Sequence, residues 1–237
     1  MCILSFETTG QLGSAALATK GGSVKQLFTS GRMDHLKELM PMAKRLLDEE
    51  GISPSDLDAV AVSKGPGSFT GIRIGVTSAR AFAQAAGKKC IAVSSLDIFR
   101  QKASAERKAA VIFNARRGQV YGAVFDNDGS DILAPGTYML TDVLEAVKDF
   151  DDAVFFGDGV DAYGAELEGY KAADASERYQ TAEMVAREAL RLLAEGKTLD
   201  YEDVMPDYMR RAEAEVKLED GSLQKMREAK LAKFRLR

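Results

Sequence analysis

The chain has 237 residues, which suits two modest lobes, and its composition of 46% hydrophobic and 29% charged residues is that of a globular protein. Its net charge of −4 argues against a protein that grips nucleic acid alone through one large basic face. Two cysteines make no disulfide framework, and no apolar segment reaches membrane-spanning length, so we expect a cytoplasmic protein with no membrane partner.

The first half of the chain predicts three strands in meander order, a helix, and then alternating strands and helices. Apolar runs bounded by turn residues indicate the strands, and apolar residues at helical spacing indicate the helices. In chain order, the expected elements are strands at 2–6, 13–18 and 24–29, a helix at 34–50, a strand at 57–62, a helix at 70–86, a strand at 90–93 and a helix from Ser94. Gly51 is placed to close the first of these helices.

The second half repeats this order of elements without repeating the sequence. Its expected elements are strands at 109–113, 120–125 and 132–140, a helix from Thr141 and a strand at 154–156. Such an order, found twice, indicates an α/β fold of two ribonuclease-H-like lobes, the architecture of the actin/Hsp70/sugar-kinase superfamily. A polar stretch at 102–108 separates the halves, so we expect an N-terminal lobe over 1–104, a C-terminal lobe over 105–211 and a charged tail over 212–237.

A glycine-rich run joins an expected strand to the helix at 70–86. Its turn-forming residues at 65–67 predict a tight exit from the strand, and Ser68 and Thr70 are candidate helix caps. The spacing fits neither of the common phosphate-binding glycine patterns. Two interpretations stay open here: a cradle of backbone N–H groups for an anion, or a structural elbow that lets a helix of small residues pack closely.

The string from Ser63 to Gly75 closely resembles the signature of the TsaB (YeaZ) family, bacterial proteins that help to make the threonylcarbamoyl modification on an anticodon-loop adenosine of tRNA. Segments 114–121 and 206–210 resemble two further motifs of that family, with Asn114 in place of the usual Asp. The residues of the signature loop are Gly65, Pro66, Gly67, Ser68, Phe69, Thr70, Gly71 and Arg73. The resemblance implies a non-catalytic subunit that forms a complex with the TsaD subunit and supports threonylcarbamoyl transfer to tRNA.

The two helices of the first half carry more apolar surface than a helix needs to cover one side of a sheet. In the resembling family, these helices pair with their equivalents in the TsaD subunit or in a second copy of the chain. The residues that we predict at the partner interface are Leu36, Leu39, Met40, Ala43, Leu47, Ile72, Val76, Ala79, Phe82 and Ala83. The resemblance also implies a TsaE-like ATPase subunit as a partner, a homodimer when the chain is alone, and contact with tRNA mainly through the complex.

A small-molecule kinase of the same superfamily, using Mg–ATP, is the alternative function. The turn Glu7-Thr8-Thr9 occupies the place where superfamily kinases hold a metal-bound phosphate, and Gly157 lies where superfamily members place a nucleotide-contacting turn. These four residues are the candidate nucleotide contacts, for ATP or ADP at a lobe or subunit interface. For the turn itself, hydroxyls that cap their own backbone are the favoured interpretation.

The sequence excludes a metal site built on a pair of histidines. His35 is the one histidine of the chain, so the paired-histidine site of the TsaD subunit cannot be formed, and Cys2 and Cys90 lack metal-ligand spacing. A Ser–His–Asp or Cys–His site would also have to use His35. We therefore predict no catalytic residue and no transition-metal site, while an all-oxygen Mg²⁺ site stays open.

The end of the charged tail is strongly basic. Residues 225–237 contain six lysines and arginines against Glu228 alone. Such runs are usually solvated. An arm that touches tRNA phosphates is the alternative interpretation.

Overall fold

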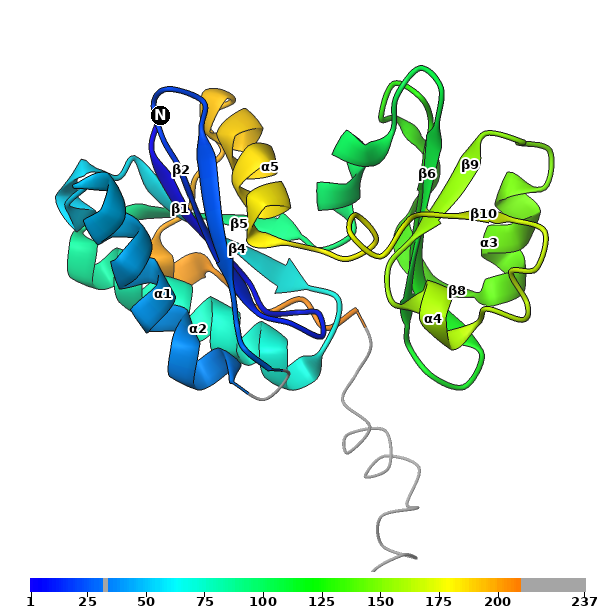
Figure 1. Cartoon of the computed structure of the whole chain (residues 1–237), viewed down its shortest axis with the longest axis horizontal. Coiled ribbons are helices and arrows are strands. Elements are labelled where there is room, and N and C mark those ends of the chain that lie inside the picture. The colour runs from blue at the N-terminus through cyan, green and yellow to red at the C-terminus, as the bar shows by residue number, and fades with distance from the viewer. Residues whose placement is uncertain (32–33, 210–237) are drawn as a thin grey trace, which may run out of the picture.

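The computed structural model of the chain describes residues 1–31 and 34–209, and these residues form two lobes that lie side by side (Figure 1). The first lobe is built on a sheet with the strand order β3-β2-β1-β4-β5. Its strands are β1 (Ile3–Glu7), β2 (Ser14–Ala18), β3 (Val24–Phe28), β4 (Ala59–Gly65) and β5 (Lys89–Ser94). The first three strands pair antiparallel, whereas β4 runs parallel to β1 and β5 runs parallel to β4.

Both faces of the first sheet are covered by helices. The helices α1 (His35–Glu50) and α2 (Phe69–Ala86) lie on one face, and α5 (Ala182–Ala194) lies on the other (Figure 1). Alternate residues of β1 therefore face different cores, since Ile3 packs toward α5 while Leu4 and Phe6 pack under α1 and α2. The helices predicted at 34–50 and 70–86 are confirmed.

The second lobe repeats the topology of the first, which confirms the predicted fold class. Its sheet has the order β10-β9-β6-β7-β8, with β6 in the central place that β1 has in the first sheet. Its elements are β6 (Lys108–Asn114), β7 (Gln119–Phe125), β8 (Asp131–Met139), α3 (Leu140–Val147), β9 (Ala153–Phe156), α4 (Gly159–Ala162) and β10 (Lys171–Ala172). The helix α3 packs over β7 and β8, and the opposite face of the sheet shares a core with the first lobe.

Three short 3₁₀ helices complete the described elements: η1 (Pro54–Asp56), η2 (Asp97–Lys102) and η3 (Tyr201–Asp203). The helix predicted from Ser94 is therefore the short η2, which begins after a turn. The Ser94 hydroxyl accepts a hydrogen bond from the Leu96 N–H at 3.3 Å, so it stabilises the turn rather than the first turn of an α-helix.

After the second lobe, the chain returns to the first lobe, so α5 and η3 pack on the first lobe although they fall within the C-terminal lobe predicted over 105–211. The Ser5 hydroxyl donates to the carbonyl of Ala182 at 2.7 Å, and the Ala182 N–H donates to the Ser14 hydroxyl at 2.9 Å. Further along, Leu199 exchanges backbone hydrogen bonds with Cys90 at the outer edge of β5. The first lobe thus takes up α5 and η3 because its second face and its edge would otherwise be exposed to water. No helix among the described residues is long and apolar enough to cross a bilayer.

Candidate functional site

The glycine-rich loop between β4 and α2 is an elbow that other backbone segments touch from two sides. Gly65 has φ 114° and Gly67 has φ 149°, values that favour glycine, and the peptide bond between Gly65 and Pro66 is cis. A side chain at Gly65 would overlap the carbonyl of Asp207, and one at Gly67 would come within 2.7 Å of the carbonyl of Thr9. The loop therefore needs glycine because distant parts of the chain lie directly against it.

The first turn of α2 packs against the end of β1 in the same way. Side chains at Gly71 or Gly75 would overlap Thr8, whose hydroxyl donates to the Gly71 carbonyl at 2.7 Å. The hydroxyl of Ser68 caps the helix by accepting from the Gly71 N–H at 3.2 Å, so Ser68 and not Thr70 is the cap. The Ser68 N–H donates to the carbonyl of Thr9 at 2.8 Å. Because these donors already have partners within the fold, the geometry favours the structural elbow over the anion cradle.

Two motif segments that lie far apart in the sequence meet on the surface beside this elbow. The rings of Phe69 and Tyr208 stack at 4.6 Å, and the guanidinium of Arg73 lies 4.1 Å from the centre of the Phe69 ring. The Arg73 Nε–H donates to the Tyr208 hydroxyl at 3.0 Å. We call Phe69, Arg73 and Tyr208 the aromatic–arginine cluster. Phe69 remains 39% exposed, so the cluster is part of the surface rather than of the core.

The residue at the centre of a kinase-like site, Glu7, is sealed inside the first lobe. Its carboxylate accepts from the N–H and the hydroxyl of Thr9, the latter at 2.6 Å, and from the hydroxyl of Ser63. Burial raises the pKa of Glu7 above its ordinary value, although the hydrogen bonds from Ser63 and Thr9 oppose the rise. A buried carboxylate whose oxygens are already occupied is unsuited to hold an exposed Mg²⁺–phosphate.

The other candidate nucleotide contacts are buried as well. Thr8 and Thr9 lie beneath the elbow, and Gly157 lies under β6 in the second lobe. The Gly157 N–H donates to the carbonyl of Arg178 at 2.8 Å, so Gly157 serves the loop closure that follows β9. The four residues are thus occupied in turns of the fold, and the structure does not favour the kinase alternative.

The predicted partner residues divide into two groups. Most of them lie in the core of the first lobe and cannot reach a partner: Leu39, Ala43, Leu47, Ile72, Val76, Ala79 and Ala83. Met40 and Phe82 are half-buried, and Leu36 is 74% exposed. His35 is buried at the start of α1, and its Nδ1 has no hydrogen-bond partner among the described residues. The helical stripes therefore face the chain's own sheet, and the exposed residues of α1 and α2 lie on the outer face of these helices, away from the sheet.

The motif of the second lobe forms the tip of the hairpin between β6 and β7. Arg116 has φ 66° and Arg117 has φ 57°, conformations that non-glycine residues rarely adopt. The side chain of Asn114 supports the turn by accepting from the Arg116 N–H at 2.8 Å, and its own N–H donates to Asp158. Burial raises the pKa of the Asp158 carboxyl above its ordinary value. Asn114 thus supports the turn of this hairpin through both its side chain and its backbone N–H.

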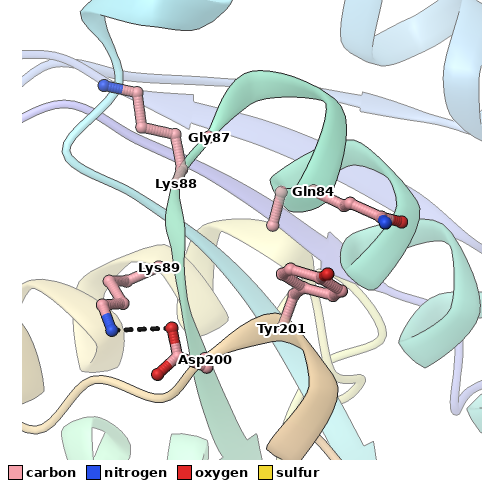
Figure 2. A pocket seen from close by; sticks show the side chains of 7 residues that line it. Gln84, Gly87, Lys88, Lys89, Asp200 and Tyr201 are labelled. Atoms are coloured by element: carbon pink, nitrogen blue, oxygen red, sulfur yellow. Dashed lines mark hydrogen bonds and ion pairs between the residues drawn. The ribbon is translucent and has the colours of Figure 1, made fainter.

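One cavity lies where η3 meets the end of α2, away from these motifs (Figure 2). Its volume is about 160 Å³, and Lys89 and Asp200 form an ion pair of 2.7 Å beside it. Pockets for small-molecule ligands are usually larger, about 300 Å³ or more. We therefore regard this cavity as a gap at the joint between the C-terminal segment and α2. No group of three or more His, Cys, Asp or Glu side chains within 1–31 and 34–209 could hold a metal ion.

Comparison with known proteins gives a consistent result. The model of the TsaD family, tRNA N6-adenosine threonylcarbamoyltransferase, matches residues 29–218. The tRNA threonylcarbamoyladenosine biosynthesis protein TsaB of Bacillus subtilis is 31% identical over 92% of this chain and 97% of its own length. The TsaB protein of Escherichia coli is 33% identical, over 89% of this chain and 95% of its own.

Solved structures and the threonylcarbamoyltransferases extend this picture. YeaZ from Pseudomonas aeruginosa superimposes with a TM-score of 0.72 and 28% identity, covering 87% of this chain and 100% of its own. The tRNA N6-adenosine threonylcarbamoyltransferase of Rhodospirillum rubrum is 42% identical, but over only 32% of this chain and 20% of its own length. The similarity to TsaB proteins thus spans nearly the whole chain, whereas that to this transferase is partial.

Proposed function

The chain belongs to the TsaB family, and on that premise we propose that it is a subunit that supports threonylcarbamoyl transfer to an anticodon-loop adenosine of tRNA. Its relatives of similar length are named as tRNA threonylcarbamoyladenosine biosynthesis proteins. In this proposal the chain works in the cytoplasm. It acts on tRNA mainly through a complex, because its negative net charge disfavours binding of a polyanion by the chain alone.

The subunit is not itself the catalyst. The observation that carries this proposal is the environment of Glu7, the acidic residue around which a kinase-like site would be built. Its carboxylate is enclosed by Thr9 and Ser63, and the described residues contain no group of three or more His, Cys, Asp or Glu side chains that could hold a metal ion. The role that remains for the chain is structural: it holds a catalytic partner in its active arrangement.

The partner is a TsaD-like catalytic subunit, and it binds the outer face of α1 and α2. The partial similarity of the chain to a threonylcarbamoyltransferase supports a pairing of two related folds. On α1 that face presents Leu36, an apolar side chain that the fold leaves exposed. Without the partner, the same face of α1 and α2 pairs with a second copy of the chain. In the complex, this chain and the TsaD-like subunit together form the surface that a TsaE-like ATPase binds, and ATP or ADP binds at the subunit interface.

Reconstitution of the modification reaction tests this function. The catalytic and ATPase subunits are combined with substrate and tRNA, with and without this chain, and the modified adenosine is quantified by mass spectrometry. We expect product only when the chain is present. Equal amounts of product in both reactions would mean that the chain shares the fold of its relatives but not their role.

A further inference from the structure

One edge of the first sheet is a strand with hydrogen-bonding groups to spare. β3 stands last in the strand order of that sheet and pairs with β2 alone among the described strands. The Thr29 N–H donates to the Gly13 carbonyl at 2.8 Å, and hydrogen-bonded pairs alternate along an antiparallel ladder, so every second residue back from Thr29 bonds to β2. The N–H and C=O groups of the residues between them therefore point outward, at Val24, Gln26 and Phe28.

The other three edges of the two described sheets are blocked. At β5, Leu199 already exchanges backbone hydrogen bonds with Cys90, and β10 has only two residues. β8 contains Pro135 and two shifts of register against β7. Proteins block edges in such ways because an unpaired edge recruits another strand. β3 has five residues in regular register and neither a proline nor a bulge, so its edge is ready to pair.

The side chains of β3 leave this edge clear. Lysine often blocks an edge by its charge, but the Lys25 ammonium forms an ion pair with Glu50 at the end of α1. The Gln26 amide donates to the Glu183 carboxylate of α5 at 3.4 Å and accepts from the Glu183 N–H at 3.3 Å. Both side chains are thus held toward the chain's own helices on the two faces of the sheet. Phe28 is 49% exposed and adds an apolar surface beside the outward backbone groups.

The residues of β3 complement a second copy of themselves. In an antiparallel pair with the two-fold axis at Gln26, Val24 lies opposite Phe28 of the second copy, and Lys25 lies opposite Leu27 of the second copy. The outward backbone groups of the two copies then face one another, and the favourable pair of an aromatic and a β-branched side chain occurs twice. An axis at Lys25 would set like charges opposite each other, which is destabilising.

We propose that β3 is a self-association surface, through which two copies of the chain join their first sheets edge to edge, antiparallel about Gln26. The joined sheet keeps α1 and α5 on its two faces in each copy. A second copy is the occupant, rather than an extended segment of another protein, because the five residues complement themselves without like charges opposite. This contact uses the strand edge and not the outer face of α1 and α2, so it goes beyond the proposed function and does not rest on it.

Disulfide trapping of the full chain tests the pairing. Gln26→Cys sets two thiols opposite each other at the axis, where Cα atoms lie about 5.5 Å apart, within the range of a disulfide. Lys25→Cys is the matched control, because its two thiols would be diagonal neighbours about 7–8 Å apart, too far to bridge. We expect mild oxidation to give a covalent dimer of Gln26→Cys and at least about tenfold less of Lys25→Cys.

The native thiols do not interfere with this measurement. Burial raises the pKa of the Cys90 thiol to about 11 and that of the Cys2 thiol above its ordinary value, so both stay unreactive at about pH 8. A mixture of Val24→Cys and Phe28→Cys chains should also crosslink, whereas neither chain should do so alone. Equal crosslinking of Gln26→Cys and Lys25→Cys, or a mixture that crosslinks no better than its separate chains, would overturn the proposal.

Sedimentation velocity measures the association without a crosslink. The chain carries Leu36→Glu, which weakens the contact through α1 and α2, so that a failure of the proposed function is not mistaken for a failure of this edge. We expect this chain still to form dimers, and added Phe28→Lys to weaken them at least about tenfold, because the two-fold axis repeats the lost pair. Met139→Lys, at the comparably exposed end of β8, is the control and should leave the dimers unchanged.

The outcomes of sedimentation decide between the two surfaces. A folded Leu36→Glu chain that is monomeric would assign self-association to the helices and overturn the proposal. Equal weakening by Phe28→Lys and Met139→Lys would overturn it as well. The trapping variants keep Leu36, so they decide the question if Leu36→Glu does not fold.

Discussion

At the scale of single residues, the environment of Glu7 separates a structural acid from a catalytic one. The sequence places an acid at the end of β1, where a phosphate-binding enzyme of this fold also has one. Only the structure shows that Thr9 and Ser63 surround the carboxylate and that no solvent reaches it. Ser63 is distant in sequence, so its contact with Glu7 depends on the parallel pairing of β1 and β4, which no local pattern encodes.

Substitutions at Glu7 should lower the free energy of unfolding, by an amount that depends on whether the new side chain keeps a hydrogen-bond acceptor. Glu7→Ala removes the acceptor of three buried donors and opens a cavity, so we expect the free energy of unfolding to fall by about 2–4 kcal/mol. Glu7→Gln keeps the shape and an acceptor, and its loss should stay under about 1.5 kcal/mol. Urea denaturation followed by circular dichroism measures both. Equal stability of the two variants would contradict the enclosed geometry.

The same residue predicts a pH dependence with a definite sign. Because burial raises the pKa of Glu7 in the folded chain, the folded state holds a proton that the unfolded state has already released above pH 4.5, the ordinary value. The stabilisation from this group is therefore complete below pH 4.5 and is lost as the pH rises through the folded-state pKa. The wild-type chain should lose stability relative to Glu7→Gln over that rise. A difference between them that does not change with pH would show that Glu7 titrates normally.

Glycines illustrate why a motif can be found in the sequence without being understood there. The four-residue spacing of Gly67, Gly71 and Gly75 is visible in the sequence, and these glycines belong to the segment that carries the family resemblance. Its cause is the close approach of Thr8 and Thr9, which belong to a strand end more than fifty residues earlier. The glycine pattern alone is compatible with both the anion cradle and the structural elbow, whereas the three-dimensional contacts favour the elbow.

At the scale of elements, the apolar periodicity of the sequence predicts where helices lie but not what their apolar faces pack against. The apolar spacing places both α1 and α2 almost at their observed bounds. The same spacing suggested a surface for a partner, whereas most of those side chains pack on β1, β2 and β4 of the chain itself. A stripe shows which side of a helix avoids water, but a sheet and a partner protein satisfy that need equally.

The helix α5 is a case in which the sequence shows the helix but not the sheet on which it packs. Its buried residues Ala182, Val185, Ala186 and Ala189 have helical spacing that inspection of the sequence could have recognised. Its packing on the first sheet, after the chain has built the whole second lobe, has no local signal, because it depends on hydrogen bonds to β1 and β2 far back in the chain.

The exposed end of α1 gives a test of the proposed partner surface. We predict that Leu36→Glu preserves the fold and weakens binding of the TsaD-like subunit at least about tenfold, because it places a charge in an apolar contact that the partner must desolvate. Met139→Glu, at a similarly apolar but distant position that is 46% exposed, is the matched control. Titration calorimetry measures the affinity, and thermal unfolding checks the fold.

The outcome depends on the burial that the structure assigns. Ala79→Glu should unfold the chain, because a carboxylate would be buried without a partner between α2 and the sheet. Equal weakening of binding by Leu36→Glu and by Met139→Glu would remove the outer face of α1 from the partner surface. A stable, well-folded Ala79→Glu protein would contradict the packing of α2.

At the scale of the whole molecule, the two lobes share a core and should behave as one unit. Phe99 of η2 packs against Phe113 and Phe156 of the second sheet at ring distances of 5.9 and 5.8 Å. The same cluster contains Ile91 and Val185 of the first lobe. The repeated order of elements in the sequence predicts two lobes. It does not predict their common core, because the elements of each half are those of a separate, complete domain.

A pair of fluorescent reporters tests whether the lobes unfold together. The chain has no tryptophan, so Phe28→Trp in β3 and Tyr170→Trp beside β10 each introduce a single reporter, at positions 49% and 37% exposed. We predict coincident denaturation midpoints for the two variants, because unfolding of either lobe exposes the shared core. Adding Phe99→Ala should lower both midpoints together, at a cost of about 3–5 kcal/mol. A reporter in β3 that shifts while the one beside β10 keeps its midpoint would show that the lobes are independent and that the phenylalanine cluster joins them only loosely.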